Sequence, residues 1–174
     1  VAMGRVPADI VIRNGVWVSV QSGEFVKNTD IAIVDGHIAF VGEDANHTIG
    51  ENTKVIDAAG KYLVPGLLDG HMHVESGMIT VTEFVRAVAK RGTTGIFIDP
   101  HEIANVCGLE GVQYMIDNGK KVPFHFFFGA PSCVPATVFE TAGAAIDSIA
   151  TAKLLASPDI YYLSEMDKNK SKFD

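Results

Sequence analysis

Short apolar runs alternate with polar positions through the first sixty residues, and glycine-containing turns separate them, which is typical of β-strands. The pattern predicts strands at residues 8–13, 16–20, 30–34, 37–42, 53–57 and 61–64. Turns at Asn14-Gly15 and Asp35-Gly36 each predict a hairpin between neighbouring strands. No helical period occurs here, so residues 1–64 are expected to form a small antiparallel β unit.

After Pro65 the pattern changes to strands that alternate with amphipathic helices. Strands are expected at residues 67–72, 94–98, 122–128 and 160–163, and helices at 80–91, 109–118 and 141–156. Thr80, with Glu83 three residues later, predicts an N-cap and a capping box. This alternation predicts right-handed βαβ units and a parallel sheet, either an open doubly wound sheet or half of an eightfold barrel.

Each of the four later strands ends in polar side chains that an apolar core does not need. Because the carboxyl ends of parallel strands meet at one edge of a sheet, these side chains are expected to converge on one site. In chain order they are His71 and His73, then Asp99, His101 and Glu102, then Ser132 and Cys133, and last Glu165.

His71 and His73 are separated by one residue, so the period of two in a strand places both imidazoles on the same face. Two neutral imidazoles on one face can hold a metal ion, whereas the alternative is a pair of histidines in a solvated turn. Asp69 and Glu75 lie close enough in the sequence to act as supporting carboxylates. His125 falls in an apolar stretch and is interpreted as a core histidine.

Composition excludes several classes of protein. The net charge of −7 and the pI near 5.3 argue against a nucleic-acid partner, because phosphate binding needs clustered lysine and arginine. No apolar run approaches the roughly 18 residues of a membrane span, and no leader pattern opens the chain, so we expect a cytoplasmic location. Cys107 and Cys133 are too far apart for a CxxC metal motif.

The β unit followed by Pro-Gly-Leu-Leu-Asp-Gly-His-Met-His at residues 65–73 resembles the amidohydrolase superfamily. Together with residues 99–106 and 129–137 it resembles the bacterial and archaeal adenine deaminases, over residues 9–166. The resemblance implies an α/β fold: a small N-terminal β-sandwich-like unit at residues 1–64, then the first half, about four βα units, of a metal-dependent (β/α)8 barrel at residues 65–166. Residues 167–174 are expected to be a solvated tail.

The resemblance also implies a site and a reaction. His71 and His73 match the pair that binds the more buried metal ion, and Glu165 matches the glutamate that bridges two divalent ions, Mn or Fe rather than Zn. His101 and Glu102 match catalytic or pocket residues, or contacts to an additional metal ion. The implied reaction is hydrolysis of adenine to hypoxanthine and ammonia by metal-activated hydroxide.

The chain departs from the family because only four strands follow Pro65. The histidines from the fifth and sixth strands and the aspartate from the eighth have no counterpart. We therefore expect an incomplete fragment that is inactive alone and homo-oligomeric, since open strand edges need a cover. Two alternatives stay open: another amidohydrolase, such as a dihydroorotase or a deacetylase, and a non-catalytic, self-associating half-barrel module. Residues 99–106 argue against the first.

Overall fold

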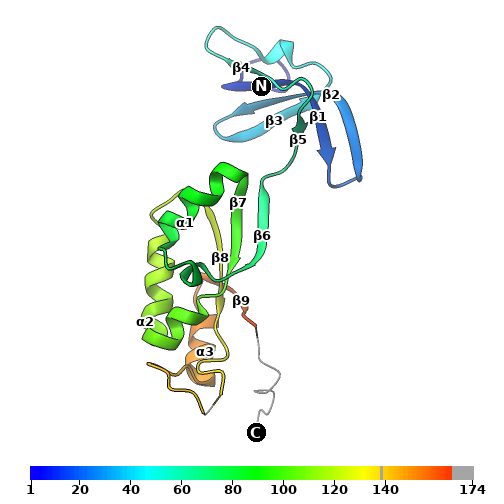
Figure 1. Ribbon diagram of the computed structural model, residues 1–174. Helices are drawn as coiled ribbons and strands as arrows, with labels where there is room; N and C mark the ends of the chain where they lie inside the picture. Colours follow the sequence, from blue (N-terminus) through cyan, green and yellow to red (C-terminus); the bar gives the residue numbers. More distant parts are fainter. Residues whose placement is uncertain (138, 166–174) are drawn as a thin grey trace. The chain divides into compact units, whose positions relative to one another are not determined.

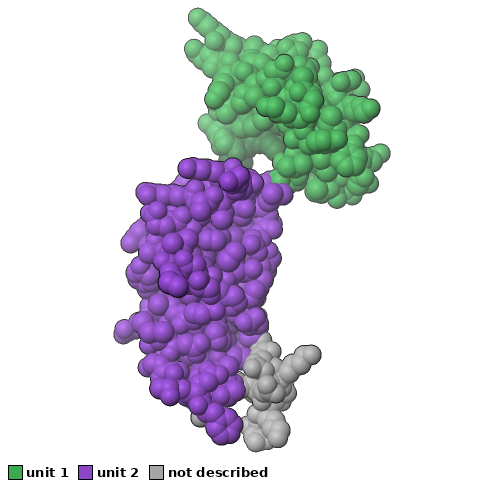
Figure 2. All heavy atoms as spheres, viewed as in Figure 1, with its two compact units in different colours: residues 1–65 green, residues 66–174 purple. Residues whose placement is uncertain are grey.

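The computed structural model describes residues 1–137 and 139–165, in two compact units. Unit 1 is Val1–Pro65 and unit 2 begins at Gly66, as the colours of Figure 2 mark. The predicted solvated tail at residues 167–174 lies outside the described residues. No helix within the described ranges is long and apolar enough to cross a membrane.

Unit 1 contains one five-stranded sheet (Figure 1). Its strands are β1 (Ile10–Ser19), β2 (Glu24–Val34), β3 (His37–Gly42), β4 (Lys54–Asp57) and β5 (Tyr62–Leu63), with the 3-10 helix η1 (Asn46–Thr48) between β3 and β4. The hairpin predicted at Asp35-Gly36 is confirmed, since β2 and β3 pair in antiparallel fashion around two residues with positive φ. However, β4 and β5 both pair with β1 in parallel, so the predicted antiparallel unit is a mixed sheet.

The hairpin predicted at Asn14-Gly15 is wrong. β1 continues through both residues and pairs with β2, with irregular register on either side of Gly15. Asn14 has φ 61° and its N–H donates to Asp30 Oδ1 at 2.9 Å, so the two residues form a bulge inside a long strand. A Cβ on Gly15 would lie 2.5 Å from the side chain of Leu63, which is why glycine is needed there.

Unit 2 is built on a parallel sheet whose four strands follow their sequence order. They are β6 (Leu67–Met72), β7 (Thr93–Ile98), β8 (His125–Ala130) and β9 (Ile160–Leu163). The helices are α1 (Val81–Val88), α2 (His101–Gly119) and α3 (Ser148–Leu155), with 3-10 helices η2 (Val74–Gly77) and η3 (Ala89–Arg91). The predicted α/β class with a parallel sheet is therefore observed.

The helices pack on one face of this sheet, as Figure 1 shows for α1 and α2. Ile96, Ile98 and Phe128 meet the helices in the main core. The other face carries an aromatic ladder of Phe97, Phe127 and Tyr162, with the Phe97 and Phe127 rings stacked at 4.7 Å. His125 is exposed, so its interpretation as a core histidine is wrong.

α1 begins after Thr80, as predicted, but without the capping box. Thr80 has an extended N-cap backbone and makes no side-chain cap bond. Its hydroxyl lies 3.0 Å from the hydroxyl of Thr82, which takes the place of the expected N–H donor. Gly92, with φ 93°, ends the following 3-10 turn in the left-handed conformation.

α2 begins eight residues earlier than predicted, at His101, and is interrupted at Gly108, where φ is 60° and ψ is −142°. The prediction had begun only after this glycine, at Leu109. α3 is shorter than predicted and begins at Ser148, where Asp147 Oδ1 accepts the N–H of Ala150 at 2.8 Å.

Candidate metal centre

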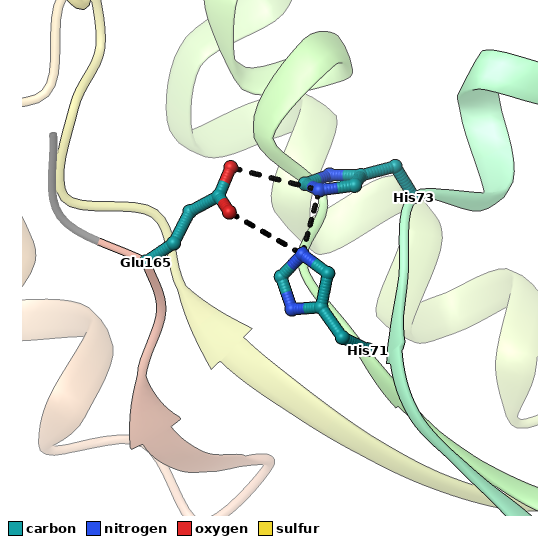
Figure 3. Close-up of side chains that lie close together, drawn as sticks. All are labelled: His71, His73 and Glu165. Carbon is teal, nitrogen blue, oxygen red and sulfur yellow. Dashed lines mark hydrogen bonds and ion pairs between the residues drawn. The ribbon is translucent and has the colours of Figure 1, made fainter.

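His71 and His73 lie at the carboxyl end of β6, where Figure 3 shows their rings turned toward one another. Their Nε2 atoms are 2.8 Å apart and the ring centroids 4.7 Å apart. Asp69 Oδ1 accepts the backbone N–H of His71 at 3.1 Å, which helps to fix the end of the strand. After His73 the chain turns into η2, whose buried Val74 anchors the turn in the core.

Glu165 reaches the same point from the end of β9. Its Oε2 is 3.4 Å from His71 Nε2, and its Oε1 is 3.6 Å from His73 Nε2. One ligand atom of each of the three residues lies within 4.8 Å of the other two, and this is the group of three metal-ligating side chains found among residues 1–137 and 139–165. The strand-end convergence expected for these three residues is therefore present in the structure.

The donor set fits a divalent metal ion. Two imidazole nitrogens and a carboxylate are borderline ligands suited to Mn, Fe or Zn. The two Nε2 atoms face each other at 2.8 Å, so one must carry a proton unless a cation takes its place between them. The carboxylate on the open side balances part of a dication's charge. His71 and Glu165 are about half-exposed, so the site is open to a small molecule.

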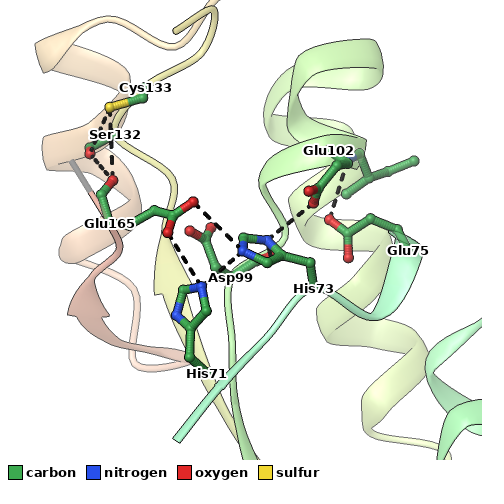
Figure 4. A network of polar contacts seen from close by, with 9 residues as sticks. His71, His73, Glu75, Asp99, Glu102, Ser132, Cys133 and Glu165 are labelled. Carbon is green, nitrogen blue, oxygen red and sulfur yellow. Dashed lines mark hydrogen bonds and ion pairs between the residues drawn. The ribbon is translucent and has the colours of Figure 1, made fainter. Parts of the chain in front are cut away.

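The other ring nitrogen of His73 is held by the protein (Figure 4). Nδ1 lies 3.0 Å from the backbone carbonyl oxygen of Asp99, to which an Nδ1–H donates. It also lies 3.1 Å from Oε2 of Glu102 in the first turn of α2. A proton kept on Nδ1 leaves the Nε2 lone pair directed at His71 and Glu165, the arrangement that a metal-ligating histidine needs.

Glu75 supports this side of the site from η2. Its Oε1 accepts the backbone N–H of Ile103 at 3.3 Å, which ties η2 to the first turn of α2. Burial raises the pKa of the Glu75 carboxyl; the Ile103 N–H opposes this shift and the nearby Glu102 carboxylate adds to it. Glu75, which the sequence predicted as a supporting carboxylate, therefore helps to hold the segment that carries Glu102.

Two further polar residues, Asp99 and Tyr162, lie near the site, and of these the sequence predicted only Asp99. Asp99 is fully buried, and neither of its carboxylate oxygens has a hydrogen-bond partner among residues 1–137 and 139–165. Burial raises the pKa of Asp99, and the imidazoles of His73 and His101 oppose the shift. Burial, with the Asp99 charge next in importance, raises the pKa of Tyr162 to about 12. The period of two along β9 indicates the position of Tyr162, because it places this side chain with Phe97 and Phe127 on the face of the unit 2 sheet that carries no helices, here called the helix-free face.

Of the remaining predicted site residues, some contact the histidine and glutamate cluster and others do not. Glu102 joins the cluster through His73, whereas His101 is not among its ligand groups. The buried Nδ1 of His101 has no hydrogen-bond partner in the part of the chain that the structure describes. Ser132, predicted among the polar residues that follow the third strand, donates its hydroxyl to the backbone carbonyl of Glu165 at 2.8 Å. Sequence patterns carry no signal for that contact, because it joins a side chain to a backbone atom 33 residues away.

A parallel α/β sheet that gathers histidine and carboxylate side chains beyond its strand ends is the design of a large class of α/β enzymes. The family described as "Amidohydrolase family" matches residues 62–170. The chain belongs to this amidohydrolase family.

Within this family, the chain is similar in sequence to curated proteins named adenine deaminase. An "Adenine deaminase 3" of Rhizobium meliloti is 60% identical over 167 residues, and an "Adenine deaminase" of Mesorhizobium japonicum is 56% identical over 167 residues. An adenine deaminase of Clostridium botulinum (strain ATCC 19397 / Type A) is 52% identical. Each alignment covers 95% of this chain and 28% of the relative, so the chain spans little more than a quarter of the length of these proteins.

Solved structures share the fold. A molinate hydrolase aligns with a TM-score of 0.52 and 25% identity, covering 71% of this chain and 30% of the other. A β-aspartyl dipeptidase from Fervidobacterium islandicum aligns with a TM-score of 0.56 and 20% identity, covering 90% and 40% of the two chains. The atrazine chlorohydrolase TrzN from Arthrobacter aurescens, solved in complex with zinc, aligns with a TM-score of 0.53 and 17% identity, covering 71% and 36%.

Proposed function

We propose that this chain forms part of an adenine deaminase, which converts adenine and water to hypoxanthine and ammonia in purine metabolism. The observation that carries the proposal is the convergence of His71, His73 and Glu165, whose ligand atoms lie within 4.8 Å of one another. Relatives at 50–60% identity bear the name adenine deaminase, and they support adenine as the substrate. They do not favour the alternatives of a dihydroorotase or a deacetylase.

A divalent metal ion, when bound, would supply Lewis acidity toward water at this site. Within the chain, His71 and His73 offer neutral imidazole nitrogens and Glu165 offers both carboxylate oxygens. The Asp99 carbonyl and Glu102 hold the proton of His73 on Nδ1. We propose manganese or iron rather than zinc, and two metal ions in the complete enzyme, with Glu165 as the bridging group.

Glu102 and His101 stay predicted pocket residues. The Glu102 side chain is 45% exposed beside His73, which leaves its carboxylate open to a bound substrate as well as to the imidazole. His101 begins α2, and its Nδ1 lacks a hydrogen-bond partner among the described residues. In this proposal both residues line the pocket that binds adenine.

The aromatic face of the unit 2 sheet supports a half-barrel. Parallel sheets are normally covered on both faces, and here one face carries helices while the other presents Phe97, Phe127 and Tyr162. We propose that residues 65–166 form the first four βα units of a (β/α)8 barrel, with this face inside, and that residues 1–64 belong to a β-sandwich-like unit. We also propose a cytoplasmic, homo-oligomeric enzyme.

A chimera tests the proposed activity. The 167-residue segment of the Rhizobium meliloti relative is replaced by the matching part of this chain, and ammonia and hypoxanthine release from adenine are measured with Mn²⁺ or Fe²⁺. We expect activity in the chimera, and its loss in chimeras that carry His71→Asn or Glu165→Gln. The matched control is His37→Asn, which changes an exposed histidine in unit 1.

An inactive chimera that folds and binds metal would overturn the proposal, as would an active chimera insensitive to both site substitutions. The 174-residue polypeptide alone is expected to release no ammonia, because its described residues bring together only three ligand side chains.

A further inference from the structure

The backbone of Glu165 lies just past the end of the β8–β9 ladder. Strand pairing ends with Ala130 opposite Leu163, and the last backbone bond runs from the Ser164 N–H to the Ala130 carbonyl at 3.0 Å. Beyond it, the Glu165 carbonyl accepts the Ser132 hydroxyl at 2.8 Å. A side-chain hydroxyl therefore continues the pairing where the backbone ladder stops.

We propose that Ser132 is a positioning residue of the metal centre, which acts by holding the backbone of Glu165; this inference rests on the proposed function. Glu165 has a long side chain with several rotatable bonds, and its two oxygens must meet two imidazoles at 3.4 and 3.6 Å. The Glu165 side chain is 55% exposed, so surrounding side chains give it little lateral support. Fixing its backbone is the way the described part of the chain aims this carboxylate.

Ser132 itself stands on a fixed base. Cys133 and Val134, the next two residues, are almost fully buried. The Ile146 N–H donates to the Val134 carbonyl at 2.9 Å, and the two residues form an isolated antiparallel β-bridge. The Cys133 thiol adds a longer contact of 3.8 Å to the same Glu165 carbonyl. The hydroxyl is thus presented by a loop that the core holds in place.

The same loop is also tied to the His73 side of the site. The N–H groups of Gly143 and Ala144 donate to the Asn105 carbonyl in α2 at 2.9 and 3.1 Å. The break at Gly108 lies just beyond Asn105, where the regular helical bonding of α2 is interrupted. One loop therefore contacts both the helix segment that carries Glu102 and the backbone that carries Glu165.

The contacts of Ser132 favour positioning over chemistry. Its hydroxyl proton is directed to a backbone carbonyl, and its other contact is the Cys133 sulfur at 3.7 Å. An activated serine nucleophile needs a base such as histidine within hydrogen-bond reach. Ser132 has no such contact in the described ranges.

The test measures Mn²⁺ binding to the full 174-residue chain by calorimetry, without any activity readout. We expect Ser132→Ala to weaken Mn²⁺ binding by about tenfold, as for the loss of a group that orients a metal ligand. Ser132→Thr keeps the hydroxyl and is expected to restore most of the affinity. The matched control is Ser157→Ala, which removes a serine hydroxyl that accepts the Asp159 N–H before the start of β9, whereas Glu165 follows the end of that strand.

Glu165→Gln separates the two proposals. If Ser132 acts through Glu165, adding Ser132→Ala to Glu165→Gln weakens binding no further. Full affinity in Ser132→Ala, or an additive loss in the double variant, would overturn this inference while the metal centre stands. Unchanged affinity in Glu165→Gln, or no Mn²⁺ binding to the unaltered chain, would overturn the metal centre and this inference with it.

Discussion

His73 Nδ1 lies 3.1 Å from Oε2 of Glu102, which joins the end of β6 to the first turn of α2. The same nitrogen is 3.0 Å from the Asp99 carbonyl, so two acceptors share one imidazole proton. A carboxylate behind a metal-ligating histidine makes the ring a stronger ligand and limits its rotation. The role that follows for Glu102 is support of His73, beside any contact with substrate.

Glu102→Gln is expected to weaken Mn²⁺ binding by about tenfold, because a neutral amide holds the imidazole proton less strongly than a carboxylate does. Calorimetric titration of the 174-residue chain measures the change. Glu110→Gln, an exposed glutamate on the same helix, is the control and should leave the affinity unchanged. Equal affinities for Glu102→Gln and the unaltered chain would remove Glu102 from the site.

The sequence predicted much of this site because its signals are local. A His-x-His at a strand end requires only the period of two, and the position of Glu165 after the fourth strand requires only the order of a parallel sheet. The contact between Glu102 and His73 was not predictable in this way, because no helix was predicted at residues 101–107. The helix turns Glu102 back toward β6, and that direction depends on tertiary packing.

Asp30→Asn is expected to lower the free energy of unfolding of unit 1 by about 1–3 kcal/mol, the cost of unsatisfied buried polar groups. Asp30 is 2% exposed, and its carboxylate accepts the N–H groups of Asn14 and Ala45 at 2.9 and 3.0 Å. An amide would turn a donor toward one of these N–H groups. Urea denaturation measures the change, and Asp35→Asn in an exposed turn is the control. Equal losses in both variants would refute the role of Asp30.

Asp57 is expected to make unit 1 sensitive to acid. The Asn14 side-chain N–H, first, and the Ala59 backbone N–H lower the pKa of Asp57 below its ordinary value of 3.8. A carboxyl with a lowered folded-state pKa stabilises the fold above the unfolded pKa and loses that contribution as pH falls through the folded pKa. Asp57→Asn should therefore unfold more easily than the unaltered chain at pH 6, and this difference should shrink below pH 3.8. Urea midpoints across pH 3–6 provide the measurement, and a difference that does not change with pH would contradict it.

Glycine signals were the least reliable part of the fold prediction, for a physical reason. Asn14-Gly15 and Asp35-Gly36 both favour positive φ, yet the first is a bulge in β1 and the second a hairpin. Local sequence specifies the backbone conformation, but the partner strand decides whether the chain reverses. Gly108 likewise marks a break inside α2, where a helix start was expected.

Gly108→Ala is expected to destabilise unit 2 by about 1–3 kcal/mol, because a Cβ is strained in this backbone conformation. The residue has φ 60°, and an added Cβ would lie 3.2 Å from the Ala144 Cβ. Gly70→Ala is the control, since a Cβ there meets open space at an ordinary φ. Thermal unfolding followed by circular dichroism compares the two, and equal stability of both variants would show that the break tolerates a side chain.

The 174-residue polypeptide is expected to self-associate through the helix-free face of unit 2. Phe97, Phe127 and Tyr162 form an aromatic surface there, and an uncovered parallel sheet favours pairing with a second copy. Phe127→Glu places a charge in this surface and should shift the protein toward monomer, as measured by light scattering after size exclusion. Phe139→Glu changes an aromatic residue that is 94% exposed outside this face, so it should leave the assembly intact. A monomeric mass for the unaltered polypeptide at micromolar concentration would rule out this association.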